Sequence, residues 1–210
     1  MSEFLPLFPL PNVVLFPNVF LPLHVFEPRY REMVADALAG DRVIGIVLLR
    51  AGWEPDYEGR PPLYPVGCSG LITHFEKLPD GRYNIVLRGV ERFALRQEDA
   101  SHNYRRALID PLPEDPLGPD ARDILHRYRR KLEALLPPIV DQVGAHAVGA
   151  AAMSDSDLVN ALAQYLDFEP IEKQALLERP SPRSRAESLI ELLEMKIMMA
   201  RTPGASSVAH

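Results

Sequence analysis

The distribution of proline limits the possible fold more than any other feature of this sequence. The 210 residues include 21 prolines, about twice the usual share of ~5%, and many of them lie in residues 6–28 and 111–119. Proline lacks an N–H and its ring disrupts a helix interior. The apolar N-terminus therefore predicts strands and turns. The same prolines, and an acidic Glu3 where a leader carries basic residues, argue against a signal peptide or a membrane span.

Short runs of β-branched and aromatic residues alternate with glycine and proline up to residue 110. Such runs predict strands, and the PDGR sequence at 79–82 predicts a hairpin turn because its glycine can adopt a positive φ. One helix is expected from Pro28, a favoured first residue, to a point before Gly40. Many short strands with one helix favour a β-barrel with the helix at one end. The predicted strands are residues 4–8, 19–23, 43–49, 70–78, 83–90 and 104–109.

A linker separates this half from a helical half. Residues 111–120 (PLPEDPLGPD) contain four prolines and three acidic residues, a composition typical of linkers. Beyond them, apolar residues recur at helical spacing. Helices are predicted over 124–135, ended by Pro137, over 158–166 with Ser154 as cap, over 170–178, and from Ser181-Pro182 onwards. The expected α+β protein has a β-barrel domain in residues 1–112, a linker in 113–120, a helical bundle in 121–202 and a flexible tail in 203–210.

Charge and composition weigh against several classes of function. The formal net charge is -6, so no overall positive field attracts nucleic acid or anionic lipid. The sequence has no glycine-rich phosphate loop followed by lysine, and its six histidines and one cysteine are too dispersed for a zinc site. We expect no metal and no cofactor. A single cysteine is typical of a reducing compartment, which predicts a cytoplasmic protein.

Two nucleophilic arrangements were candidates for catalysis. Cys68 with His74 would supply a thiolate and a base, although six residues of extended chain place them roughly 20 Å apart. A serine–lysine pair would use Lys173 or Lys196 as the base. We interpret Cys68 as a buried, small apolar residue. The serines near these lysines are better explained as helix caps and exposed positions, and they are Ser181, Ser184 and Ser188.

His24 and Glu27 lie three residues apart and have two interpretations. One is an acid–base or metal-binding pair. The other is structural, because a glutamate with an arginine partner commonly fixes a corner between a strand and a helix. We favour the structural interpretation and predict a buried ion pair between Glu27 and Arg92.

Several short motifs follow one another in the first half of the chain: LPLFPLP, LFP, LPLHVFEPRY and, further on, RGVERF. In order and spacing they resemble the N-terminal substrate-binding domain of Lon-type ATP-dependent proteases. The resemblance covers residues 4–110 and implies a PUA-like β-barrel followed by a helical bundle. The ATPase and Ser–Lys peptidase motifs of those proteases have no counterpart here. The structural motif residues that the resemblance implies are Pro22, His24, Glu27, Pro28, Arg29, Tyr30, Gly89, Arg92 and Phe93.

The expected function is therefore a non-catalytic module that binds unfolded or peptide substrates, with a protease or chaperone as a further partner. Residues 50–65 (RAGWEPDYEGRPPLYP) are the candidate binding segment, because Trp53, Tyr57 and Tyr64 supply contact area at low rotamer cost. A core position for Trp53 at the barrel end is the competing interpretation.

Two other functions stay open from the sequence. RNA binding through the PUA-like barrel would use the basic clusters at 105–106 and 127–131. The competing interpretation is that these clusters are solvent-exposed charged faces without a ligand. A small Cys or Ser hydrolase would use the nucleophiles described above. The sequence does not indicate an oligomeric state.

Overall fold

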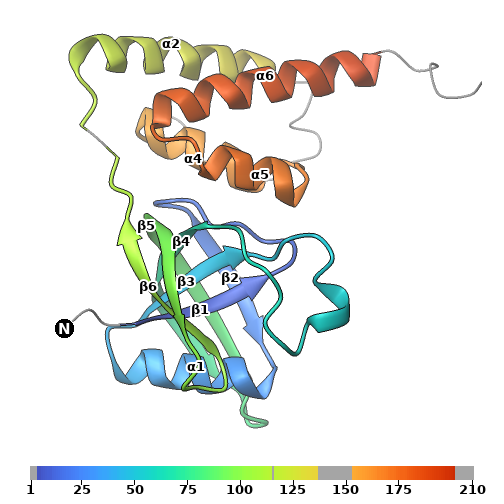
Figure 1. The fold of residues 1–210 in the computed structure, drawn as a ribbon. Helices are drawn as coiled ribbons and strands as arrows, with labels where there is room; N and C mark the ends of the chain where they lie inside the picture. The colour runs from blue at the N-terminus through green and yellow to red at the C-terminus, as the bar shows by residue number, and fades with distance from the viewer. Residues whose placement is uncertain (1–3, 115, 137–152, 202–210) are drawn as a thin grey trace, which may run out of the picture. The chain divides into compact units, whose positions relative to one another are not determined.

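The protein is described by a computed structural model over residues 4–114, 116–136 and 153–201 (Figure 1). These residues form six strands and five α-helices, which confirms the predicted α+β class. The strands are β1 (Leu5–Leu10), β2 (Phe20–Val25), β3 (Val43–Leu48), β4 (Val66–Lys77), β5 (Tyr83–Asp99) and β6 (Arg105–Pro111). The helices are α1 (Pro28–Ala39), α2 (Pro119–Leu135), α4 (Asp155–Tyr165), α5 (Pro170–Leu177) and α6 (Pro182–Arg201), with a 3-10 turn η1 (Glu54–Asp56).

The strand pairings close five strands into a ring. The order is β2-β5-β4-β3-β1-β6, and β6 also pairs with β5. One end of β5 pairs with β2 and its other end pairs with β6, so its 17 residues reach around the ring. Strand β2 is hydrogen-bonded to β5 alone among the described strands, which makes it a free edge.

Prolines explain how β1 fits between its two neighbours. Leu5, Pro6 and Leu7 pair with β6, whereas Leu7 to Leu10 pair with β3 in parallel. Pro6 and Pro9 therefore each lie where β1 has a partner strand on one side only. Proline, having no N–H to donate, is tolerated at such positions. As a result β1 and β3 separate at the start of β1.

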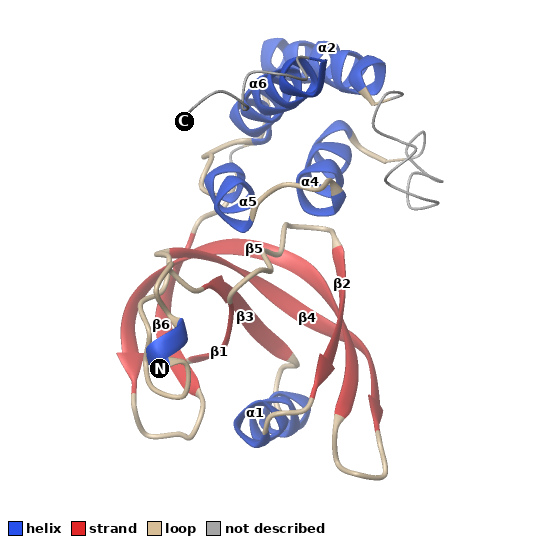
Figure 2. Ribbon diagram, turned by 90° about the vertical axis from the view of Figure 1, so that its right-hand side faces the viewer, coloured by secondary structure: helices blue, strands red, loops and turns tan. Residues whose placement is uncertain are grey.

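Helix α1 lies across one end of the ring (Figure 2). It begins at Pro28 and ends before Gly40, as predicted. Its buried residues are Tyr30, Met33, Val34 and Ala37, spaced for one face of a helix. The Tyr30 ring packs against Phe8 of β1 with 4.5 Å between centroids, which ties the helix to the strands.

Two strands are longer than the sequence predicted. Strand β5 continues past residue 90 to Asp99, and β4 starts at Val66 instead of residue 70. Gly89 lies inside β5, where glycine is uncommon. A Cβ at Gly89 would lie 2.0 Å from the carbonyl oxygen of Phe16, so this glycine permits a close backbone approach inside a strand.

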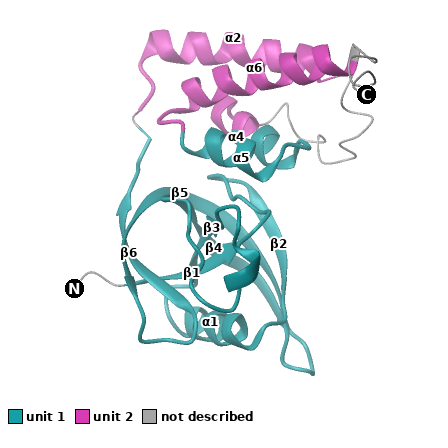
Figure 3. Ribbon diagram, turned by 45° about the vertical axis from the view of Figure 1, so that its right-hand side comes forward, with its two compact units in different colours: residues 1–114, 160–178 teal, residues 115–159, 179–210 magenta. Residues whose placement is uncertain are grey.

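The residues group into two compact units (Figure 3). The first contains residues 1–114 and 160–178, and the second contains residues 115–159 and 179–210. The predicted domain boundaries stay a prediction, and they differ from these units in residues 160–178. The end expected for the first long helix at Pro137 and the tail at 203–210 lie outside the described residues.

Side-chain amides join residues 160–178 to the strand-containing part of the first unit. Gln164 Oε1 accepts a hydrogen bond from the Phe16 N–H at 3.0 Å. Gln174 Nε2 donates to the Val66 carbonyl at 3.0 Å. Gln164 and Gln174 are buried, and a buried amide is costly unless it is hydrogen-bonded, so these contacts specify where the helical segment docks.

In the second unit, α2 packs against α6. Leu125 and Leu132 of α2 are buried, and so are Leu189 and Leu193 of α6. Lys131 Nζ also lies 2.7 Å from Glu194 Oε1. Among the helices of the described ranges, none is both long and apolar enough to cross a membrane.

Candidate functional site

The loop between β3 and β4 has a closed base. Leu49 and Leu63 form an isolated antiparallel bridge. The Tyr64 N–H donates to the Leu48 carbonyl and the Arg50 N–H donates to the Pro62 carbonyl, both at 2.9 Å. These bonds bring the two ends of residues 50–65 together, and we call this segment the 50–65 loop.

Two arginines that lie outside the loop hold it in place through hydrogen bonds from their guanidinium groups. Arg29, at the start of α1, donates to the carbonyls of Tyr57 at 3.2 Å and Glu58 at 3.4 Å. Arg105 of β6 donates to the Pro61 carbonyl at 2.6 Å. Arg105 also makes a two-point contact with Glu98, at 2.6 and 2.8 Å. Hydrogen bonds from charged donors are stronger than neutral ones, so the loop backbone is fixed before any ligand arrives.

A cluster of three side chains fixes the middle of the loop. The Tyr57 hydroxyl donates to Glu27 Oε1 at 2.5 Å, and Arg29 Nε donates to Glu27 Oε2 at 3.1 Å. The Arg29 guanidinium also lies 5.0 Å from the Tyr57 ring centroid. Burial, followed by the hydrogen bond to Glu27, raises the pKa of Tyr57. Tyr57 therefore keeps its proton to a higher pH than a free tyrosine does, and keeps donating to Glu27.

Trp53 contacts this cluster through the Tyr57 ring. Its ring meets the Tyr57 ring edge-on, with 5.3 Å between centroids, a favoured geometry for aromatic pairs. Trp53 is half-buried and is not among the buried core residues, so the core interpretation is wrong. Tyr64 is also half-buried and lies under the Arg50 guanidinium at 5.5 Å. The role of these three aromatic residues in binding stays a prediction.

The predicted pair of Glu27 and Arg92 is wrong. Glu27 contacts Tyr57 and Arg29, whereas Arg92 donates to the Leu177 carbonyl at 3.1 Å and lies 3.6 Å from Glu114. The sequence reasoning correctly placed a glutamate–arginine pair at the corner before α1 but chose the wrong arginine. Arg29 is two residues away and reaches Glu27 without any long-range contact.

His24 does not act with Glu27. His24 Nδ1 lies 2.7 Å from Asn84 Oδ1, and its Nε2 lies 3.2 Å from Arg82 Nη1. Both ring nitrogens are thus engaged with β5 and its preceding turn. Both carboxylate oxygens of Glu27 accept hydrogen bonds, so the structural interpretation of this segment fits the contacts better than an acid–base pair.

The other motif residues occupy positions where their side chains or backbone have structural roles. Pro22 lies opposite Val86 on the edge strand β2, Pro28 is the first residue of α1, and Phe93 is buried in the core. Arg92 is only 4% exposed.

The hydrolase candidates are not arranged for catalysis. Cys68 is fully buried and His74, on the same strand, is exposed. The Lys173 ammonium donates to the Gln164 carbonyl at 2.7 Å, and burial lowers the pKa of Lys173. Ser181 Oγ accepts a hydrogen bond from the Ser184 N–H at 3.2 Å, which is the capping role expected for it. In the parts of the chain that the structure describes, no three His, Cys, Asp or Glu side chains gather as metal ligands.

The basic cluster at 105–106 is neutralised, and the cluster at 127–131 is neutralised in part. Arg105 is paired with Glu98 and Arg106 with Asp99. In α2, Arg129 contacts Glu133 at 2.9 Å and Asp155 at 3.1 Å. Arginines already paired with carboxylates are less available to neutralise phosphate groups, so the contacts at 105–106 count against RNA binding through that cluster.

Two hollows flank Tyr104, and the sequence reasoning missed both. One, of about 210 Å³, lies between the 50–65 loop, the start of α1 and the turn before β6, and Arg60 and His102 line it. The other, of about 390 Å³, lies near the other end of α1. Their lining residues come from segments far apart in the sequence, so no local pattern indicates them.

The first unit is thus a closed sheet that carries an ordered loop with three aromatic side chains. Residues 4–195 match the family model described as the ATP-dependent protease La (LON) substrate-binding domain. The chain belongs to this family, as the motifs indicated. The match is to the substrate-binding domain and not to an ATPase or peptidase domain.

Relatives and solved structures agree with this assignment. The chain is 28% identical over 200 residues to Lon protease 2 of Myxococcus xanthus, covering 92% of this chain and 24% of that protein. It is 27% identical over 188 residues to Lon protease 2 of Syntrophobacter fumaroxidans, covering 89% and 24%. The chain thus spans about a quarter of the length of these relatives.

Two solved structures share the fold. The N-terminal domain of a Mycobacterium avium complex Lon protease aligns with a TM-score of 0.71 at 16% identity, over 91% of this chain and 98% of that one. A Lon N-terminal domain protein from Xanthomonas campestris aligns with a TM-score of 0.60 at 25% identity, over 90% and 98%. The Lon N-terminal fold is therefore confirmed.

Proposed function

We propose that this chain binds unfolded or peptide segments of other proteins through the 50–65 loop and does not itself catalyse a reaction. The observation that carries the proposal is the half-buried Trp53–Tyr57 pair, in which Tyr57 is fixed by Glu27 and Arg29 and Trp53 packs edge-on against it. Unfolded clients share only apolar side chains and backbone amides, so a surface for them needs exposed aromatic area.

Preorganisation supports the same site. Arg29 and Arg105 occupy loop carbonyls, and Tyr57 is fixed by its hydroxyl. A loop that is already ordered loses less conformational entropy on binding than a flexible one. An aromatic pair with two χ angles per side chain adds contact area at a low entropic cost.

Membership of the Lon substrate-binding family supports a protein client. A non-enzymatic role is supported by the burial of Cys68 and by the capping role of Ser181. We also propose a cytoplasmic location, a PUA-like barrel followed by a helical bundle over 121–202, and a protease or chaperone as a further partner. The boundaries proposed for the barrel and linker are 1–112 and 113–120.

Anisotropy of a fluorescein-labelled, reduced and carboxymethylated α-lactalbumin tests the site. Trp53→Ala is expected to weaken binding by about tenfold, the loss typical of an aromatic anchor. Phe75→Ala on β4 is the control, because Phe75 is 43% exposed and outside the loop, and its affinity should stay within about twofold of the unmodified protein. Equal losses for the two variants would show that the loop is not the site.

A further inference from the structure

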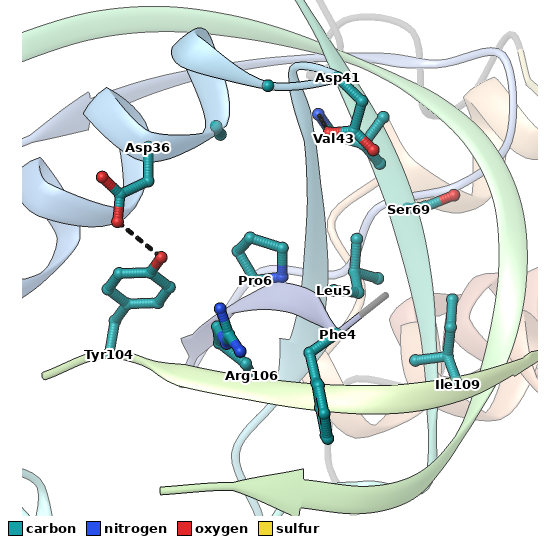
Figure 4. Close-up of a pocket in the computed structure, with 12 residues that line it drawn as sticks. Phe4, Leu5, Pro6, Asp36, Asp41, Val43, Ser69, Tyr104, Arg106 and Ile109 are labelled. Carbon is teal, nitrogen blue, oxygen red and sulfur yellow. Dashed lines mark hydrogen bonds between the residues drawn. The ribbon is translucent and has the colours of Figure 1, made fainter. Parts of the chain in front are cut away.

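A cavity of about 390 Å³ opens where β1 separates from β3 (Figure 4). The pairing of β1 with β3 begins at Leu7, so Leu5 and Pro6 face this gap with partners on β6 only. The end of α1, the start of β3, Ser69 of β4 and the first residues of β6 complete the lining. Its size is at the lower end of the ~300–1,000 Å³ typical of small-ligand sites.

Two carboxylates line this cavity with unused hydrogen-bonding capacity. Asp36 Oδ2 accepts the Tyr104 hydroxyl at 2.8 Å, and Asp41 Oδ1 accepts the Val43 N–H at 3.0 Å. Over the described residues, neither Asp36 Oδ1 nor Asp41 Oδ2 receives a hydrogen bond from a protein donor. Both aspartates are exposed at the cavity mouth, so a ligand can reach these oxygens.

The cation in the lining is already occupied. Arg106 Nη2 lies 3.0 Å from Asp99 Oδ2 and its Nε donates to the same oxygen at 3.2 Å. Its Nη1 lies 3.2 Å from His102 Nε2. The charge that remains available in the lining is that of Asp36 and Asp41 and is negative, so the cavity favours a cationic ligand over an anionic one.

The rest of the lining is largely apolar. Leu5 and Ala37 are buried, and Val43 and Ile109 are half-buried. A methylene chain can lie on such a surface while the charged group at its end reaches the carboxylates. The combination fits lysine and arginine side chains, which carry a cation on an apolar stem.

We propose that this cavity binds a lysine or arginine side chain of a polypeptide client, with the carboxylates of Asp36 and Asp41, on separate sides of the cavity (Figure 4), supplying the negative charge that attracts the cation. The inference rests on the proposed function, since it assumes a polypeptide ligand. It adds a charge preference that the aromatic loop alone does not give. Tyr104 lines both this cavity and the hollow beside the 50–65 loop.

Amide chemical shifts of the ¹⁵N-labelled full chain test the proposal with three probes. Acetyl-Leu-Lys-Leu-amide is expected to shift the signals of Ala37, Val43 and Ser69, and to bind about two to five times more tightly than the same peptide with glutamine. Equal affinity of the two peptides, or shifts confined to other residues, would overturn the proposal. So would n-butylamine binding as tightly as the lysine peptide, because the cavity would then serve free amines.

A double variant with a matched control locates the charge effect. Asp36→Asn with Asp41→Asn keeps both acceptor oxygens for Tyr104 and Val43, and should remove the preference for lysine over glutamine. Asp80→Asn changes an exposed acid on the hairpin turn and should leave the preference intact. A preference that survives the double variant refutes the assignment. The comparison of peptides on the unmodified protein stands even if the double variant unfolds.

The outcome is separable from that of the loop test. Loss of α-lactalbumin binding in Trp53→Ala without any lysine preference at the cavity would reject the cavity alone. Lysine-specific shifts at the cavity with no effect of Trp53→Ala would reject the loop alone.

Discussion

Replacing Arg92 by methionine is expected to destabilise the first unit by about 3 kcal/mol. Arg92 is 4% exposed, and its Nη1 donates to the Leu177 carbonyl at 3.1 Å. Methionine keeps an unbranched apolar stem but has no N–H, so the variant loses a charge-assisted hydrogen bond, worth about 1.5–3 kcal/mol. It also leaves the Leu177 carbonyl without this donor, at a cost of about 1–3 kcal/mol.

The ion pair with Glu114 adds little to this figure. Its side chain is 23% exposed and the pair distance is 3.6 Å, so the Glu114 carboxylate regains water when Arg92 is removed. For this reason the lower end of the range of about 3–5 kcal/mol for breaking a buried pair is the appropriate one.

Urea unfolding followed by tryptophan fluorescence measures the effect. Trp53 is the single tryptophan and lies in the first unit, so its emission reports on that unit. With a slope of about 2 kcal/mol per molar urea, the midpoint should fall by about 1.5 M.

Arg96→Met is the matched control on the same strand. Arg96 also pairs with an acid, Asp110 at 2.5 Å, but its side chain is 66% exposed. Exposed ion pairs contribute about 0–1 kcal/mol, so this midpoint should fall by less than about 0.5 M. If both variants lower the midpoint equally, burial does not set the value of the Arg92 contacts and the reasoning fails.

Two further predictions concern the backbone of β5 and the alkaline stability of the protein. Gly89→Ala should destabilise the first unit by about 2–4 kcal/mol, because the new Cβ would lie 2.0 Å from the Phe16 carbonyl oxygen. Gly118→Ala is the control, since there is open space around its Cβ position, and it should change the thermal midpoint much less. Similar changes in the thermal midpoint for the two variants would refute the close-approach argument. Burial raises the pKa of Tyr30 from 10.0 to about 12, so the unfolded chain loses this proton first and stability should fall as the pH rises from 10 towards 12. Tyr30→Phe should make that decline shallower in urea midpoints measured between about pH 9 and about pH 11.5, and an unchanged slope would contradict the assigned cause.

Local signals account for the parts of the fold that the sequence predicted. Pro28 and Gly40 bracket α1, and the PDGR turn lies between β4 and β5. Such features depend on residues a few positions apart, so proline, glycine and apolar spacing are sufficient to locate them.

Long-range contacts account for the parts that were missed. Gln164 and Gln174 look like ordinary polar helix positions, yet they bond to Phe16 and Val66. Their partners lie 148 and 108 residues away in the chain. The cavity beside β1 is set in the same way, by which segments meet in space. The pairing of Glu27 with Arg29 is different, because these residues are two positions apart and the local choice was available in the sequence.

The free edge of β2 is interrupted by a proline, and this affects how readily another strand can add to the sheet. A third strand joining that edge would need a donor at every second residue, and Pro22 has none to offer. Exposed edges otherwise serve as templates for cross-β growth. Pro22 therefore interrupts the row of backbone donors that an extended chain would need in order to pair with β2, which lowers the risk that this exposed edge starts cross-β aggregation.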